Sequence, residues 1–287
     1  MLTALRRHWP EYLIEAAGLG IFMIAACLAT ALLELPASPV RQAIADPVLR
    51  RALVGSAMGL TAIALTYSPW GKQSGAHFNP TLTLTFFQLG KVAPADAVFY
   101  VLAQFAGGLA GVLVAVAVLG KGIMDPAVGY IVTVPGAPGV GVAFLAEAMI
   151  AFGLMVVVLA VSNTPRLARF TGLCAGLLVL TYITFEAPLS GMSMNPARTL
   201  GSAIAAQVWT ALWVYFTAPP LGMALAAELY SRLKGPNAIR CAKLHHDNDR
   251  RCIFRCGYHL DGMAAAQRPE YPDQAAERSG ARGASSP

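Results

Sequence analysis

The sequence predicts an all-α membrane protein in which six transmembrane helices and two re-entrant half-helices form an inverted repeat. Three observations predict this fold: an apolar composition, six long uncharged stretches, and two apolar stretches interrupted by Asn-Pro. Of the 287 residues, 56% are hydrophobic and 13% are charged, whereas a soluble domain carries about 25% charged residues. We therefore expect most of the chain to lie in a lipid bilayer.

Six stretches have the length and composition of membrane spans. A bilayer core about 30 Å thick needs roughly 20 apolar residues for each helical crossing. The predicted spans are approximately 12–33, 51–67, 95–119, 140–161, 170–185 and 208–230. They are rich in Gly and Ala, which lets helix backbones approach closely in lipid. The six helices are therefore expected to pack as a bundle.

Two further stretches, 68–89 and 187–206, are apolar but contain turn-forming residues. Their central runs are Ser74-Gly75-Ala76-His77-Phe78-Asn79-Pro80-Thr81 and Ser190-Gly191-Met192-Ser193-Met194-Asn195-Pro196-Ala197-Arg198. Irregular backbone at membrane depth is tolerated only inside protein or beside a water-filled cavity, so these stretches predict a pore. Because Asn is a favoured N-cap and Pro a favoured first helical residue, half-helices are predicted at 81–89 and 197–206.

An internal repeat relates the two halves of the chain. Each half has a glutamate in its first span (Glu15 or Glu147), then a second span, an Asn-Pro half-helix and a third span. Because three spans is an odd number, the second half enters the membrane inverted, and the positive ends of the half-helices meet at its midplane. The predicted divisions are a cytoplasmic N-terminus (1–11), two repeats (12–119 and 140–231), a connecting loop (120–139) and a cytoplasmic polar tail, partly disordered (232–287).

The basic residues lie mainly in short loops and in the tail, and they account for the formal net charge of +6. They are not interleaved with aromatic residues as in nucleic-acid-binding modules, so we expect no nucleic acid partner. Their excess on one side of the predicted spans places both termini in the cytoplasm. We therefore expect a multi-pass protein of the plasma (inner) membrane.

The two Asn-Pro runs, together with Glu15 and Glu147, resemble the aquaporin (major intrinsic protein) family over roughly 12–232. The resemblance implies a passive channel for water that excludes protons and ions, with glycerol, urea, ammonia or similar neutral solutes as the alternative cargo. It also implies a homotetramer with one pore per subunit. We expect no enzymatic activity, no cofactor and no bound metal.

The resemblance assigns roles to individual residues. The motifs Asn79-Pro80-Thr81 and Asn195-Pro196-Ala197 would present the asparagine amides to passing solute, and Glu15 and Glu147 would support the two loops. The narrowest ring would contain Met58 (with Gly59 as the other choice), Ile183, Met192 and Arg198, whose charge opposes the passage of cations. The remaining path would be lined by backbone carbonyls of Gly75, Ala76, His77, Gly191, Met192 and Ser193.

Some residues depart from the family pattern or disagree about the cargo. Ile183 stands where strict water channels usually have histidine, which favours larger neutral solutes. In contrast, Thr199, Ala203 and the Tyr215-Phe216 pair resemble the water-type members. Thr81 replaces the usual alanine, and we expect little effect on the mechanism.

Other readings of the same residues stay open. Glu15 and Glu147 within an inverted repeat could serve a proton-coupled transporter, and His77 could sense pH rather than pack against the loop. A non-conducting relative is a further possibility, whereas no catalytic set is visible at membrane depth. The tail has soft ligands at Cys241, His245, His246, Cys252, Cys256 and His259. Their spacing matches no familiar zinc motif, so we expect free thiols, with zinc as the alternative.

Overall fold

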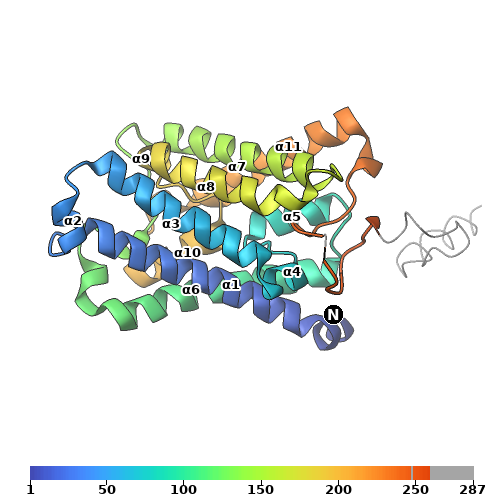
Figure 1. Ribbon diagram of the computed structural model, residues 1–287, viewed down its shortest axis with the longest axis horizontal. Helices are drawn as coiled ribbons and strands as arrows, with labels where there is room; N and C mark the ends of the chain where they lie inside the picture. Colours follow the sequence, from blue (N-terminus) through green and yellow to red (C-terminus); the bar gives the residue numbers. More distant parts are fainter. Residues whose placement is uncertain (247, 259–287) are drawn as a thin grey trace, which may run out of the picture.

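The computed structural model describes residues 1–246 and 248–258, in which the regular structure is helical (Figure 1). The long helices are α1 (Leu2–Glu34), α3 (Pro47–Tyr67), α6 (Pro94–Leu119), α7 (Val140–Ser162), α8 (Thr171–Phe185) and α11 (Leu212–Lys234). The shorter α-helices are α2 (Pro39–Ala43), α4 (Pro69–Ser74), α5 (Pro80–Gln88), α9 (Ala187–Ser190) and α10 (Pro196–Ala206). Turns of 3-10 helix are η1 (Gly120–Met124), η2 (Gly129–Ile131), η3 (Ala168–Phe170) and η4 (Pro236–Ala238). The predicted fold class is confirmed.

The helix bounds differ from the predicted spans chiefly at the two ends of the chain. Helix α1 begins at Leu2 and α11 ends at Lys234, because hydropathy marks where lipid ends rather than where a helix ends. The sixth span was predicted from 208, but left-handed backbone at Gln207 and Ala211 delays α11 to Leu212. His259 and the rest of the predicted disordered segment lie outside the described residues.

Five helical segments among the described residues are both long and apolar enough to cross a membrane. The sixth long helix, α11, has 23 residues but contains Pro219 and Pro220 and ends with Arg232 and Lys234 in its last turn. It packs along α7 as α6 packs along α1. The repeat therefore places α11 as the sixth member of the bundle even though its sequence is less apolar.

Close helix contacts occur at glycines that the repeat duplicates. A Cβ atom on Gly107 of α6 would collide with the backbone of Ala16 on α1, and one on Gly222 of α11 would collide with Ala148 on α7. Between α3 and α8, a Cβ on Gly59 would lie 2.6 Å from the carbonyl oxygen of Gly176. The small residues therefore set the backbone separation in this bundle, as expected where lipid offers no hydrophobic drive for association.

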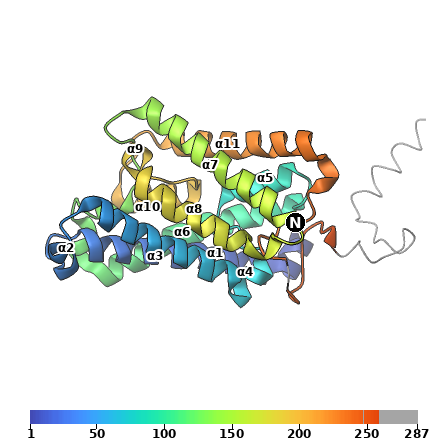
Figure 2. The same cartoon turned by 45° about the horizontal axis from the view of Figure 1, so that its top comes forward.

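The two half-helices lie toward opposite ends of the bundle. In Figures 1 and 2, α5 lies toward the end that carries the N-terminus and the tail, and α10 lies toward the end that carries α2. The helices begin at Pro80 and Pro196, directly after the asparagines that cap them. This arrangement brings the N-terminal ends of α5 and α10 together in the middle of the molecule, as the sequence predicted.

Candidate functional site

The two capping asparagines are linked to each other's loops. The Nδ2 atom of Asn79 donates a hydrogen bond to the carbonyl oxygen of Met194 at 2.8 Å, and Nδ2 of Asn195 donates to that of Phe78, also at 2.8 Å. The Oδ1 atom of Asn79 accepts from the backbone N–H of Thr81, and that of Asn195 accepts from those of Ala197 and Arg198. A primary amide has two N–H donors, so each asparagine retains one for another partner. Both asparagines line the central cavity.

The loops before the half-helices share an unusual backbone. Positive φ angles occur at equivalent positions in the two loops, with values of 59° at Ala76 and 49° at Met192, and of 45° at Phe78 and 53° at Met194. Left-handed backbone costs energy for residues other than glycine and persists only where the surroundings impose it. Left-handed residues at alternate positions turn successive peptide groups in different directions. This arrangement therefore leaves N–H groups available to the protein on one side.

The two glutamates supply the acceptors for those N–H groups. Glu15 is fully buried and accepts from His77 N at 3.1 Å and from Phe78 N at 2.6 Å. Glu147, also fully buried, accepts from Ser193 N at 2.6 Å and from Met194 N at 2.7 Å. Neither glutamate lines the central cavity. Their contacts fix the loop backbone. Because neither carboxylate reaches the cavity, the structure gives no support to a proton relay along the solute path.

Each loop has a tyrosine that the sequence interpretation did not assign to it. The hydroxyl of Tyr100 donates to the carbonyl oxygen of Ser74, and that of Tyr215 donates to the carbonyl oxygen of Ser190, both at 2.6 Å. The two tyrosines follow their serines by 26 and 25 residues. This near-equal spacing within the repeat was the available signal. Tyr215 was considered only as a cue to the cargo class.

A cavity of about 320 Å³ runs past the asparagines. At the α2 end its wall includes Glu34 and Arg51, and at the tail end it includes Leu65, Thr66 and Leu244. Apolar side chains predominate between these ends. A wall of this kind offers few strong binding partners, which suits passage rather than retention of a solute.

The four residues predicted to form the narrowest ring all line this cavity: Met58, Ile183, Met192 and Arg198. Gly59, the other choice on the second span, is not among the lining residues and instead lies against Gly176. Val54, one helical turn from Met58 on α3, also lines the cavity and was missed by the sequence interpretation. The one-turn spacing on a helix already assigned to the pore was the signal that could have found it.

Arg198 brings a positive charge into the cavity wall. It follows the second Asn-Pro motif in the first turn of α10, and its Nη1 atom donates to the carbonyl oxygen of Ile131 at 3.3 Å. That contact anchors the guanidinium group to the connecting loop. The positive N-terminal ends of α5 and α10 lie in the same region, so the electrostatic potential there opposes cations.

The expected carbonyl lining differs at Gly75, because the tail covers it. The Gly75 carbonyl oxygen accepts from Leu244 N at 3.1 Å, and Gly75 is not among the cavity-lining residues. The other five residues predicted to line the path through their carbonyls do line the cavity: Ala76, His77, Gly191, Met192 and Ser193. The tail was expected to be an ordinary polar segment, and its packing against a re-entrant loop was not foreseen.

His77 is held from both sides of its ring. Its Nε2 lies 2.8 Å from the carbonyl oxygen of Ala242, and its Nδ1 lies 3.0 Å from Oγ1 of Thr83. The ring is buried and stacks between Phe86 and Phe254. Because a carbonyl can only accept, Nε2 carries the proton in this arrangement. These contacts support the packing role rather than the pH-sensing role considered from the sequence.

The family model for the major intrinsic proteins matches residues 4–230. Aquaporin NIP6-1 of Arabidopsis thaliana is 38% identical over 183 residues, which cover 63% of this chain and 58% of the relative. Aquaporin NIP2-3 of Zea mays is 34% identical over 186 residues, which cover 64% of this chain and 60% of the relative. The matched segment thus spans less than two thirds of these relatives.

A solved aquaglyceroporin from Plasmodium falciparum shares the fold of this chain. The two superpose with a TM-score of 0.66 over 80% of this chain and 98% of the other, at 22% sequence identity. The long apolar helices, the paired half-helices and the family match agree with one another. This multi-pass membrane protein therefore belongs to the major intrinsic protein family.

Proposed function

We propose that this protein is a passive transmembrane channel for water and small uncharged solutes, and that it excludes protons and ions. The observation that carries the proposal is the pair of asparagine amides. Each amide donates one hydrogen bond to the opposite loop and retains a second N–H donor, and both asparagines line the cavity. Two donors at the middle of a narrow path can hold the oxygen of a passing water molecule.

Exclusion of charge follows from the same geometry. A water molecule whose oxygen accepts from Asn79 and Asn195 directs its own hydrogens away toward the two ends of the path. It cannot then accept a hydrogen bond from a neighbouring water, so the relay needed for proton hopping is interrupted. Arg198 and the positive ends of α5 and α10 add an electrostatic barrier to cations. No step in this mechanism makes or breaks a covalent bond, so we propose no enzymatic role.

The second candidate is a facilitator for larger neutral solutes such as glycerol or urea. It is favoured by the apolar side chains of Met58, Ile183 and Met192 around the cavity. An imidazole at position 183 would add a hydrogen-bonding group and reduce the width of the ring. Ile183→His should therefore lower the ratio of glycerol flux to water flux, and an unchanged ratio would remove Ile183 from the selectivity site.

The assembly and the membrane location are also proposals. The excess of Lys and Arg in the N-terminal segment, the loops at the same end and the tail supports cytoplasmic termini in a plasma (inner) membrane. Exposed leucines on several long helices, among them Leu102, Leu145 and Leu225, supply apolar surface for lipid or for other subunits. We propose a homotetramer with one pore in each subunit.

Proteoliposomes test the proposed function. Under an osmotic gradient alone, vesicles containing the protein should shrink faster than protein-free vesicles, and isosmotic glycerol or urea gradients should reveal which solutes follow water. The rates should not change when a proton or sodium gradient is imposed. A requirement for such a gradient would overturn the channel proposal in favour of a coupled transporter.

A further inference from the structure

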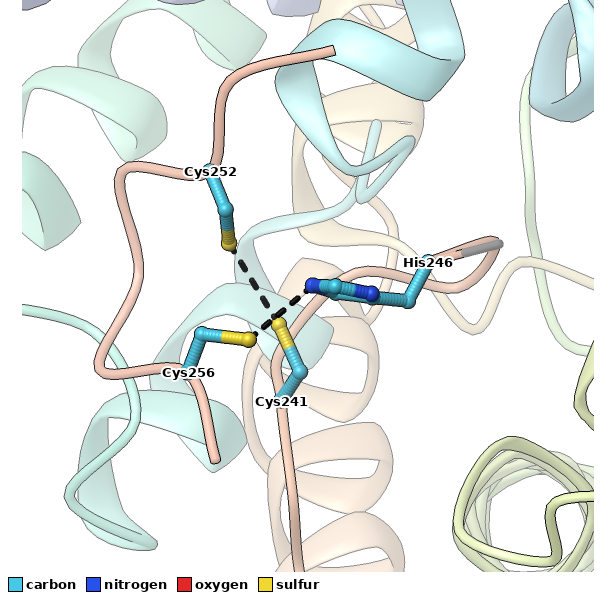
Figure 3. Close-up of side chains that lie close together, drawn as sticks. All are labelled: Cys241, His246, Cys252 and Cys256. Carbon is cyan, nitrogen blue, oxygen red and sulfur yellow. Dashed lines mark hydrogen bonds between the residues drawn. The ribbon is translucent and has the colours of Figure 1, made fainter. Parts of the chain in front are cut away.

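Four side chains of the tail converge on one point although they are spread over Cys241 to Cys256. Figure 3 shows the sulfur atoms of Cys241, Cys252 and Cys256 and the imidazole of His246 directed toward one another. The four potential ligand atoms all lie within 4.8 Å of one another. The Sγ atoms of Cys241 and Cys252 are 3.5 Å apart, and Sγ of Cys256 is 2.9 Å from Nε2 of His246.

We infer that these four residues form a structural Zn²⁺ site. A tetrahedral zinc ion with bonds of about 2.3 Å to sulfur and about 2.0 Å to nitrogen separates its ligand atoms by roughly 3.5–3.8 Å. The observed separations bracket that range, so small side-chain rotations would complete the tetrahedron. Three thiolates and one imidazole are a preferred ligand set for zinc, and four protein ligands leave no open position for catalysis.

The surroundings of the cluster fit such a site. Cys241 and Cys256 are buried, and the backbone N–H of Lys243 donates to Sγ of Cys241 at 3.5 Å, a contact that supports a thiolate ligand. The His246 ring stacks on Tyr258 with centroids 4.5 Å apart, which fixes its orientation. Zinc with three thiolates carries a net charge of about −1, and the nearby ammonium groups of Lys91 and Lys243 have the opposite sign.

The site lies where the tail packs against the first re-entrant loop. Three neighbouring residues attach the tail to the first re-entrant loop: Ala242 bonds His77, Leu244 bonds Gly75 and Phe254 stacks on His77. Leu244 also forms part of the cavity wall. Residues 239–246 and 248–258 have little regular structure, so ordering them costs conformational entropy. A metal ion that links residues 241, 246, 252 and 256 would offset that cost.

Metal analysis of the full-length protein tests this inference independently of transport. Protein purified from zinc-supplemented culture and freed of loose ions by gel filtration should contain about one zinc ion per chain. Cys241→Ser and Cys256→Ser should reduce zinc to background. Cys174→Ser, the same change at a cysteine on α8 that is not part of the cluster, should retain the wild-type content. Background zinc in the wild type, or equal zinc in all variants, would overturn the inference.

Thiol labelling of the wild type provides a second test that does not depend on the folding of variants. With zinc bound, Cys241, Cys252 and Cys256 should resist N-ethylmaleimide, and a zinc chelator such as 1,10-phenanthroline should make all three reactive. Mass spectrometry of the digested protein identifies the labelled positions. Immediate labelling without chelator would exclude the site. A Cys241–Cys252 disulfide that the chelator does not affect would exclude it as well.

Discussion

The two re-entrant loops share one backbone design but are covered by different segments. The second loop is covered by the connecting loop, in which Thr133 bonds Thr199 at 2.8 Å and Thr199 in turn bonds Ser193 at 2.5 Å. The first loop is covered by the tail. There His77 and Thr83 correspond to Ser193 and Thr199, and Nδ1 of His77 lies 3.0 Å from Oγ1 of Thr83. The connecting loop is held by helices at both of its ends. The described part of the tail follows α11 and packs against the first loop through Ala242, Leu244 and Phe254.

Some parts of the two loops are shared and others are specific to one half. The shared parts are the asparagine caps, which line the cavity, and the buried glutamates and the tyrosines, which hold the loops. The specific parts are Arg198 in the second half and the tail at the first loop. We therefore expect changes to shared residues to affect folding in either half, and changes to specific residues to affect what passes.

The largest expected effect comes from Glu147→Ala and Glu15→Ala. Removing Glu147 leaves the Ser190 hydroxyl and two backbone N–H groups without their acceptor, and each buried orphan costs about 1–3 kcal/mol. We expect both variants to lose most of the folded protein, measured as the yield of monodisperse protein and its thermal stability. Glu228→Ala, on the exposed surface of α11, is the control. Wild-type stability in only one glutamate variant would show that the loops do not share this support.

Arg198→Ala should produce the next largest change, now in selectivity. Loss of the guanidinium group removes a positive charge from the cavity wall and widens the cavity. Ion leakage and the flux of larger solutes should therefore increase, and the protein should remain folded. Arg51→Ala is the matched control, because Arg51 lines the same cavity near its α2 end. Equal leakage from the two variants would mean that Arg198 does not form the constriction.

Leu244→Ala tests whether the tail contributes to the path. Because Leu244 lines the tail end of the cavity, a smaller side chain should widen that end and raise the water permeability of proteoliposomes several-fold. Leu233→Ala, at an exposed position of α11, should leave the permeability unchanged. If Leu244→Ala behaves like this control, the tail end does not limit flux.

The smallest expected effect concerns Thr81, which replaces the alanine usual in the family. Its side-chain oxygen is buried and has no hydrogen-bond partner among the described residues, which costs stability. Thr81→Ala should therefore raise the free energy of unfolding by about 1 kcal/mol without changing water flux. Thr85→Ala, which removes a bond to the Thr81 carbonyl at 2.8 Å, should not stabilise. Thermal denaturation in detergent compares the two, and a stabilised Thr85→Ala would contradict the explanation.

The fold could be predicted from the sequence because its signals are local. Asn-Pro marks the start of each half-helix, and apolar length marks each span. The buried glutamates followed from the family resemblance. The tail could not be predicted in the same way. The irregularly spaced cysteines converge on a surface that the first loop supplies. That loop is far away in the sequence, since His77 and its partner Ala242 are 165 residues apart. Tyr100 was missed for a similar reason, since its partner is a backbone carbonyl that no motif identifies.

Paired water and proton permeabilities of the same proteoliposome preparation test the central claim most directly. If the amides of Asn79 and Asn195 orient water in a single file, osmotic water flux should rise well above that of protein-free vesicles. Proton leakage, followed by an entrapped pH dye, should stay at the protein-free level. Proton leakage that rises in parallel with water flux, or water flux no greater than that of empty vesicles, would contradict the account.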